Sequence, residues 1–201
     1  MTDKVTTLLL VRHGESTWNA ERRLQGHTDA PLSRRGRQQA GRLGPIVAGF
    51  GRLTATSSDL DRARETAALL GHPAARLDPR WREQDLGAWP GASIDALRRD
   101  DAAGYRAWRE GRATPPGGES FQALCARIRA AVSTLTDVGG NQLVVAHGGA
   151  IRAACAVLVG LRADAVVPVG PATMTVIDIT DRPRLRLYNL APETVAPDPP
   201  D

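Results

Sequence analysis

Apolar positions along the chain form short continuous runs of the kind that buried strands show. Val5–Val11 (VTTLLLV) is apolar and rich in β-branched residues, and Leu143–Ala146 is a second such run. Leu53–Ser57 predicts a further strand, while Met174–Ile179 and Leu185–Leu190 alternate weakly, as two paired strands do. These five segments are expected to form the sheet of the protein.

Between these runs, apolar residues recur every three or four positions, which predicts helices. The clearest repeat runs from Glu119 to Thr136, where five apolar side chains share one face. The other predicted helices are Ser33–Ala48 and Asp59–Leu70, each with its first residue as the cap, Ile94–Arg99, and a helix that follows His147 and ends at Leu158. Strands that alternate with helices predict an α/β fold, a three-layer αβα sandwich with a mostly parallel central sheet.

The length of 201 residues fits one domain, and 42% hydrophobic residues suffice for a core. We predict a single domain over residues 1–190 and a disordered tail, rich in Pro and acids, at Ala191–Asp201. No apolar run reaches the roughly 20 residues of a membrane-spanning helix. The first residues lack a secretory layout, and Cys125 and Cys155 are expected to be buried free thiols in helices. We therefore expect a cytoplasmic protein without a membrane partner.

The net charge of +4 comes almost entirely from arginine, since Lys4 is the only lysine. The planar guanidinium group suits phosphate and carboxylate oxygens, although coding bias is the better explanation for most individual arginines in a chain so rich in Ala and Gly. Acidic residues interrupt the arginines throughout, so the chain lacks the basic stripe of a nucleic-acid binder. We therefore expect no nucleic-acid partner.

Two segments share one design, an apolar strand that ends in a histidine followed by glycine. They are LLLVRHGE, which contains His13, and LVVAHGG, which contains His147. Ligands of open parallel sheets bind at the carboxyl ends of the strands, and the helix N-termini that follow favour an anion. A lone histidine at a strand end is more often structural, but two in matching contexts favour a functional site. The contexts of His27 and His72 are not comparable.

Two arginines and one acid complete the set of candidates. Arg12 directly precedes His13, and Arg62 follows the predicted strand Leu53–Ser57 at another strand-to-helix junction. Arg62 fits a solvated helix arginine in an i,i+4 pair equally well. Glu83 lies between two tryptophans in WREQDLGAW, a setting that suits a general acid. Taken alone, Glu83 is better explained as a surface acid.

Six segments of the chain, in order, resemble the histidine phosphatase superfamily, the phosphoglycerate-mutase-like proteins. Together they cover almost the whole chain except the tail, which makes a chance match negligible. The segments are RHGE (Arg12–Glu15) with Trp18 and Asn19 following, LSRRGRQQA (Leu32–Ala40), SSDLDRARETA (Ser57–Ala67), REQDLGAWPG (Arg82–Gly91), PGGES (Pro116–Ser120) and VAHGG (Val145–Gly149). The resemblance implies the phosphoglycerate-mutase-like version of the predicted α/β fold.

The resemblance also implies roles for individual residues. His13 matches the nucleophile that becomes phosphohistidine, and Glu83 matches the acid/base. Arg12, Arg62 and His147 match a clamp on the phosphate oxygens, which neutralises the phosphoryl group in flight without a metal. Further contacts to phosphate or substrate are implied at Asn19, Gly26 and Gly148.

Neither a metal nor a cofactor is expected. Asp and Glu are not grouped at ligand spacing, neither cysteine lies in a Cys-x-x-Cys motif, and both GxxxxGK[ST] and GxGxxG motifs are lacking. The expected partner is a small-molecule phosphate ester. The sequence does not determine the oligomeric state, and a homodimer stays open.

The leading interpretation is a phosphomonoester hydrolase that acts on a small phosphorylated metabolite. Mutase chemistry at the same site is the first alternative, and a non-catalytic phosphate-binding module is a remote one. Mutases of this family carry an inserted basic segment after the acid/base, whereas only Leu86–Pro116 stands there in this chain. Gly and Ala at Ala102–Gly104 and Gly111–Ala113 are expected to make this segment an open rim rather than a sealed lid.

Overall fold

The computed structural model describes residues 5–192, and its centre is one six-stranded sheet. The strands are β1 (Thr6–Arg12), β2 (Thr54–Ser57), β3 (Arg76–Leu77), β4 (Gly140–Ala146), β5 (Met174–Ile179) and β6 (Arg184–Leu190). They lie in the order β3-β2-β4-β1-β5-β6. The first four in this order are parallel neighbours, and β5 and β6 continue the sheet in antiparallel pairs. The prediction of a mostly parallel sheet is thus confirmed.

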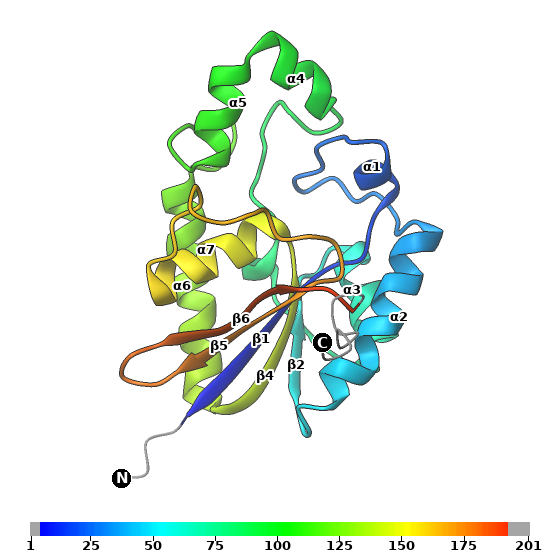
Figure 1. Cartoon of the computed structure of the whole chain (residues 1–201), viewed down its shortest axis with the longest axis vertical. Coiled ribbons are helices and arrows are strands. Elements are labelled where there is room, and N and C mark those ends of the chain that lie inside the picture. The colour runs from blue at the N-terminus through cyan, green and yellow to red at the C-terminus, as the bar shows by residue number, and fades with distance from the viewer. Residues whose placement is uncertain (1–4, 193–201) are drawn as a thin grey trace, which may run out of the picture.

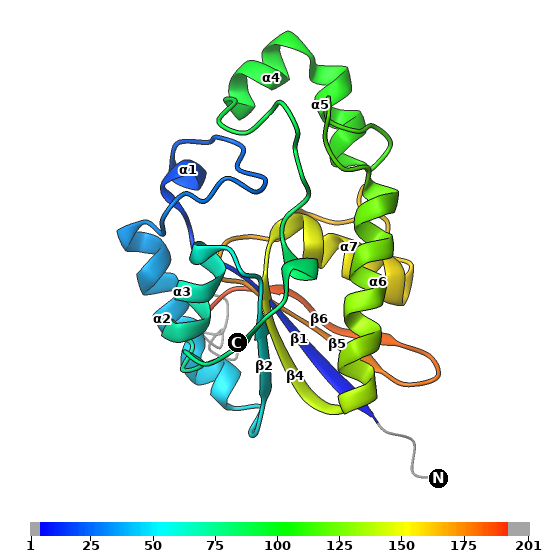
Figure 2. The ribbon, with the colours of Figure 1, turned by 180° about the vertical axis from the view of Figure 1, so that it is seen from behind.

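Helices cover both faces of the sheet and one of its ends (Figures 1 and 2). The helices are α1 (Thr17–Ala20), α2 (Arg34–Ala48), α3 (Asp61–Leu69), α4 (Ile94–Asp100), α5 (Ala102–Arg109), α6 (Phe121–Val138) and α7 (Gly148–Val159), with a short 3-10 helix at Pro79–Trp81. Helices α6 and α7 lie against one face, and α2 and α3 lie against the other. The predicted three-layer α/β fold is therefore also confirmed.

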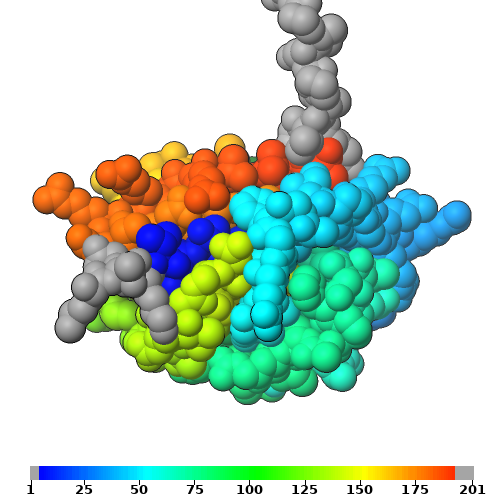
Figure 3. All heavy atoms as spheres, turned by 90° about the horizontal axis from the view of Figure 1, so that it is seen from below, coloured from blue at the N-terminus to red at the C-terminus, as the bar shows by residue number. Residues whose placement is uncertain are grey.

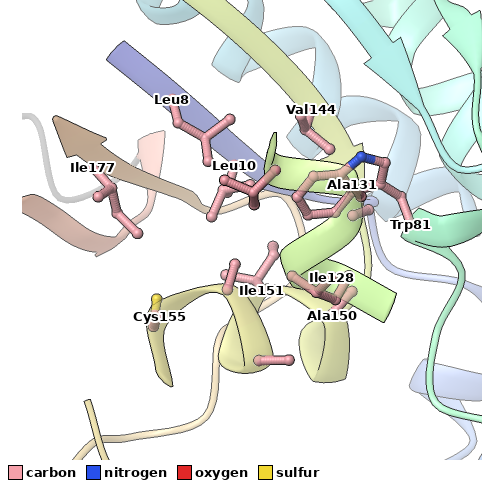
Figure 4. Packing of buried hydrophobic residues seen from close by; sticks show 14 of the residues in the cluster. Leu8, Leu10, Trp81, Ile128, Ala131, Val144, Ala150, Ile151, Cys155 and Ile177 are labelled. Atoms are coloured by element: carbon pink, nitrogen blue, oxygen red, sulfur yellow. The ribbon is translucent and has the colours of Figure 1, made fainter. Parts of the chain in front are cut away.

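Strand β1 shows how the sequence builds these layers. Side chains alternate across a strand, so Leu8 and Leu10 point to the face of α6 and α7, and Leu9 and Val11 point to the face of α2 and α3. All four are fully buried. Trp81 joins the first cluster from the 3-10 helix (Figure 4). Burial of each such side chain contributes about 1.5–3 kcal/mol, which fixes the site end of β1 firmly.

Two helix starts differ in how they are capped. Ser33 accepts a hydrogen bond from the backbone N–H of Gly36, so the predicted cap of α2 is confirmed. The prediction of Asp59 as the cap of α3 is wrong, because α3 begins two residues later and the Asp59 carboxylate pairs with Arg82. The first N–H groups of α3 are instead bonded by the carboxylate of Asp29, a residue far away in the sequence. A local capping pattern does not reveal such a long-range partner.

Residues 87–117, which we call the cover segment, leave the sheet layers and return to them at adjacent points. The N–H of Ala88 donates to the carbonyl of Pro116 at 2.9 Å, and the N–H of Glu119 donates to that of Asp85 at 2.9 Å. Gly87 allows this junction, because a Cβ there would lie 2.2 Å from the carbonyl oxygen of Pro116. The segment rises above the carboxyl ends of β1 and β4 and carries α4 and α5 (Figure 1).

Of the two stretches expected to form an open rim, Gly111–Ala113 lie outside the helices and Ala102–Gly104 lie inside one. These residues form the first turn of α5, and the carboxylate of Asp101 caps it by accepting from the N–H of Gly104. The cover segment also has an apolar cluster of its own, in which Trp108 packs with Leu86. Small residues permit a helix as readily as a loop when a cap precedes them, and here the cap decides.

At the opposite end of the molecule, the chain around residue 50 packs beside the start of β4 (Figure 3). The Asn141 side chain donates to the carbonyl of Phe50 there, at 2.7 Å. Residues 193–201, most of the predicted tail, lie outside the described residues. Within residues 5–192, no helix is both long and apolar enough to cross a membrane. Both cysteines are free thiols in helices, as expected, but Cys125 is only half-buried whereas Cys155 is buried.

Candidate active site

The two predicted histidines meet at the carboxyl end of the sheet. β1 and β4 are parallel neighbours, with Arg12 opposite Ala146, so the residue that follows each strand reaches the same edge. The ring centroids of His13 and His147 lie 5.1 Å apart, and the ring planes are tilted by 60°. His13 is 2% exposed and His147 is fully buried. The pairing of strands has therefore brought together two residues that are 134 positions apart in the chain.

The tautomer of His13 follows from its hydrogen bond. Its Nδ1 lies 2.7 Å from the carbonyl oxygen of Gly14. A carbonyl oxygen can only accept, so Nδ1 carries the proton in this bond. The lone pair of a neutral ring then resides on Nε2, which is the arrangement that a nucleophilic imidazole requires.

Arg62 is held rigidly by backbone oxygens beside this ring. Its guanidinium donates to the carbonyls of Gly26 at 2.8 Å and Thr28 at 2.9 Å, and to the carboxylate of Asp29 at 3.1 Å. The side chain is 1% exposed. Gly26, predicted to contact phosphate or substrate, lines the cavity and positions Arg62 through its carbonyl. The arginine is thereby fixed as a donor before any ligand arrives.

Several buried polar atoms at this point have no partner among residues 5–192. They are the Nε atoms of Arg12 and Arg62 and the Nδ1 atom of His147. Arg12 is otherwise anchored, since Nη1 donates to the carbonyl of Val169 at 2.6 Å, and Nε2 of His147 bonds Ser58 Oγ at 2.9 Å. Buried polar atoms without partners are costly. Such a cluster of them fits an anion such as phosphate.

The pKa values of the two imidazoles are shifted by the same causes. Burial, followed by the positive charge of Arg62, lowers the pKa of His13 and that of His147 well below the usual 6.5. Both rings are therefore neutral at pH 7 in the ligand-free protein. A neutral His13 is ready to attack. A bound phosphate dianion would favour protonation of His147, which then serves as a charged donor.

These shifts predict that the protein loses stability in mild acid. Below pH 6.5 the unfolded chain binds protons at His13 and His147, whereas the folded chain does so only at lower pH. Above pH 6.5 the folded state keeps its full stability with respect to these two groups. As the pH falls from 6.5 towards its lowered pKa, each histidine lowers the free energy of unfolding by up to about 1.4 kcal/mol per pH unit. Urea titrations between about pH 5 and pH 8 would measure this slope. His147→Asn should reduce the slope, and His72→Asn is the matched control. A free energy of unfolding that stays constant down to about pH 5 would contradict the prediction.

The side chain of Glu83 reaches the N-terminus of α7 from the loop that follows the 3-10 helix. Its carboxylate accepts from the backbone N–H of Gly149, at 2.9 Å and 3.2 Å for its two oxygens, and from that of Gln84 at 2.9 Å. A Cβ at position 149 would lie 2.2 Å from the carboxylate oxygen Oε1, so a larger residue there would displace the Glu83 carboxylate from this position. The two tryptophans beside Glu83 in the sequence serve other purposes. Trp81 is in the core, and Trp89 packs edge-on against Trp108.

The backbone that carries Glu83 is braced by two residues that the sequence analysis did not identify. Arg127 donates to the carbonyls of Arg80, Arg82 and Glu83 at 2.7, 3.0 and 3.2 Å, and it forms an ion pair with Glu119. His27 Nε2 lies 2.8 Å from the same Glu83 carbonyl. Each lies more than 40 positions from Glu83 in the sequence, so its role depends on the fold. Together these bonds hold in place the backbone from which the Glu83 carboxylate projects.

A cavity of about 580 Å³ opens over these groups. The predicted site residues that line it are Arg12, His13, Asn19, Gly26, Arg62, Glu83 and Gly148. His147 packs against the His13 ring and does not itself line the cavity, and Asn19 Oδ1 accepts from the N–H of Ser16 in the capping box that starts α1. The cavity wall also includes Trp108, Arg109 and Arg152, none of which was predicted as a site residue. Within residues 5–192, no three or more His, Cys, Asp or Glu side chains are grouped to hold a metal ion.

Comparison with known proteins identifies relatives over nearly the whole chain. The family model described as the histidine phosphatase superfamily (branch 1) matches residues 8–191. A probable phosphoglycerate mutase of Salmonella paratyphi C is 37% identical over 163 residues, which cover 77% of this chain and 75% of that protein.

Solved structures agree with this match. A mycobacterial glucosyl-3-phosphoglycerate phosphatase in complex with VO3 has a TM-score of 0.83 and 34% identity, and the match covers 92% of this chain and 99% of that one. A structure named mycobacterial hydrolase 1 has a TM-score of 0.86 and 34% identity, with 93% and 99% of the two chains covered.

Proposed function

The chain belongs to the histidine phosphatase superfamily (branch 1), and from this premise we propose that it hydrolyses phosphate monoesters of small metabolites. One observation carries the proposal above all. The neutral ring of His13, with Nε2 free, lies in a cavity beside two buried guanidinium groups whose Nε atoms have no partner among residues 5–192. The arrangement suits attack on a phosphoryl group. The solved phosphatase from mycobacteria supports hydrolysis as the reaction class.

The first step of the proposed reaction forms a phosphoenzyme. Nε2 of His13 attacks phosphorus, a P–N bond forms, and the P–O bond to the leaving group breaks. Arg12 and Arg62 neutralise the charge that is spread over the equatorial oxygens. Glu83 enters this step as a protonated acid and gives its proton to the leaving oxygen.

The second step returns the enzyme to its starting state. Water attacks the phosphohistidine while the Glu83 carboxylate takes one of its protons, and the P–N bond breaks. Inorganic phosphate leaves, His13 is again neutral with its proton on Nδ1, and Glu83 is protonated for the next cycle. His147 and the N–H of Gly148, at the start of α7, add donors to the same oxygens.

The phosphoenzyme is expected to be acid-labile and base-stable, because a phosphoramidate on imidazole hydrolyses when its nitrogen is protonated. Labelled substrate, quenched within one turnover and then split between acid and alkali, gives the measurement. Turnover should also persist in chelator, since the proposed clamp consists of side chains. An acid-stable label would point to a serine or threonine ester. Loss of activity in chelator, restored by a divalent ion, would contradict the metal-free mechanism.

Mutase chemistry remains the alternative, and two observations bear on it. One relative is named a probable phosphoglycerate mutase. The cover segment is helical, has an apolar cluster of its own and contributes Tyr105, Trp108 and Arg109 to the cavity wall. A mutase must keep water from its site, because its phosphohistidine must survive until a second hydroxyl arrives. A non-catalytic phosphate-binding module would need none of the acid/base geometry found at Glu83.

We expect water to be the main acceptor, so that phosphate release exceeds the conversion of 3-phosphoglycerate to 2-phosphoglycerate, even with the bisphosphate present. Phosphorus NMR follows both products in one sample. Isomerisation that outruns phosphate release by about tenfold or more would replace the hydrolase by a mutase. A screen of sugar phosphates and phosphorylated acids would then define the substrate.

Because both cysteines are free thiols, we place this activity in the reducing cytoplasm.

A further inference from the structure

A tight turn that follows α1 lies against two parts of the catalytic site. The N–H of Thr28 donates to the carbonyl of Gln25 at 3.1 Å and closes the turn. Within it Gly26 has a φ of +55°, which glycine adopts at no steric cost. The turn packs closely on the segment that follows the acid/base, because a Cβ at Gly26 would lie 3.2 Å from the Cβ of Leu86.

The backbone of this turn holds one catalytic group, and its histidine side chain holds another. The carbonyls of Gly26 and Thr28 accept from the Arg62 guanidinium at 2.8 and 2.9 Å. Nε2 of His27, the residue between them, lies 2.8 Å from the carbonyl oxygen of Glu83. A carbonyl oxygen only accepts, so Nε2 carries the proton and donates it in this bond. One turn thus contacts both the arginine of the proposed phosphate clamp and the backbone of the acid/base.

We propose that His27 is a positioning residue, which sets the distance between the carboxyl group of Glu83 and a phosphate held by Arg62. The proposal rests on the phosphomonoesterase function proposed above and concerns its proton-transfer step. The acid must meet the leaving oxygen of an ester whose phosphorus is on His13, and a misplacement of about 1 Å can lower the rate by up to about 100-fold. A direct bond between the turn that holds the clamp and the backbone that carries the acid sets this distance.

Arg127 donates to the same carbonyl, but it joins the acid/base to a different part of the fold. Its Nη2 lies 3.2 Å from the Glu83 oxygen, whereas His27 Nε2 lies at 2.8 Å. Its other bonds go to two further carbonyls of the same stretch and to the carboxylate of Glu119. Arg127 therefore fixes Glu83 relative to α6, and His27 fixes it relative to the turn that holds Arg62.

The carboxylate of Glu83 is held at a second point, which provides a way to observe its position. It accepts from the backbone N–H of Gly149 at 2.9 Å. Loss of the His27 side chain leaves this contact possible but loosens the backbone from which the carboxylate projects. The N–H of Gly149 therefore reports on the position of the acid without any turnover.

The kinetic test compares a poor and a good leaving group. His27→Ala should slow the phosphorylation step with a sugar phosphate by about 3- to 10-fold, the usual effect of one lost hydrogen bond. Nitrophenyl phosphate needs little proton transfer, so its phosphorylation step should slow by less than about 2-fold. His27→Gln should keep most of the rate with the sugar phosphate, because its amide nitrogen donates from about the same place as Nε2. His72→Ala, at a histidine outside the cavity lining, is the matched control.

Binding of inorganic phosphate separates positioning from a structural role. Arg62 keeps its own bonds to the turn in His27→Ala, so calorimetry should give a phosphate affinity within about 2-fold of that of the wild type. Weaker phosphate binding together with equal slowing of both esters would show that His27 only supports the fold of the turn, and would overturn the proposal. A His27→Gln variant as slow as His27→Ala would overturn it as well.

Nuclear magnetic resonance of the Gly149 N–H separates failure of this inference from failure of the proposed function. Glu83→Ala removes the acceptor and gives the chemical shift of the lost bond. His27→Ala should move the resonance part of the way to that value, and His27→Gln should leave it near the wild-type position. An unchanged resonance in His27→Ala would overturn the positioning role even if phosphate esters are hydrolysed. If no ester is hydrolysed but the resonance moves as expected, the positioning of Glu83 by His27 stands and the hydrolase proposal falls.

Discussion

Replacing His13 by alanine should lower the hydrolysis of an aryl phosphate by at least about 10⁴-fold, as loss of a catalytic nucleophile does in other covalent enzymes. The methyl group cannot form a P–N bond, and Arg12 and Arg62 alone only bind the phosphate. Nδ1 of the ring is held at 2.7 Å from the Gly14 carbonyl, and His13 lines the cavity whereas the neighbouring His147 does not. Steady-state rates with nitrophenyl phosphate give the measurement.

The matched control is His72→Ala, which removes a histidine outside the cavity lining. Far-UV circular dichroism and thermal unfolding should show that both variants are folded. His13→Ala should also fail to incorporate label from substrate, because the phosphoenzyme cannot form. A folded His13→Ala variant that keeps a substantial share of the wild-type rate would disprove the nucleophile assignment.

Replacing Glu83 by glutamine should slow transfer from a sugar phosphate by about 10²- to 10⁴-fold, and transfer from nitrophenyl phosphate much less. A sugar alkoxide is a poor leaving group that needs a proton in the transition state, whereas nitrophenolate leaves without one. The amide keeps the size of the side chain and can still accept from the N–H of Gly149. Single-turnover rates of the phosphorylation step with each ester measure the difference.

Glu65→Gln is the control for this second experiment. Glu65 lies on α3, pairs with Arg37 and does not line the cavity. It should leave both rates unchanged. If Glu83→Gln slows phosphorylation by the same factor for both esters, Glu83 has a role other than proton donation.

Five of the six strands and the two site histidines were predictable because their signals are local, whereas the two-residue strand β3 was not predicted. An apolar run with β-branched residues predicts a strand wherever it occurs, and a ligand edge follows from parallel pairing. His13 and His147 could therefore be identified without knowledge of their contacts. The resemblance supplied Arg62 and Glu83, for which composition and spacing alone favoured no functional role.

The missed features depend on partners that lie far away in the chain. Asp29 caps a helix that begins 32 positions later, and Arg127 braces the backbone at Glu83 from α6. Arg152 was not predicted as a site residue. The fold makes it part of the cavity wall, because its own turn of α7 faces the cover segment. The sequence around these residues shows no local pattern that distinguishes them from charged residues on a solvated surface.

The junction of the cover segment has a consequence for how specificity can diverge. Residues 87–117 enter and leave at hydrogen-bonded neighbours, Ala88 with Pro116 and Asp85 with Glu119, so the ends stay together whatever lies between them. His13, Arg62 and Glu83 are all held by groups outside this segment. A segment of different length or charge can therefore be exchanged at this point while the reacting groups keep their positions. Exchanging the cover segment between relatives should therefore change the preference for acceptor and substrate while the reacting groups stay the same.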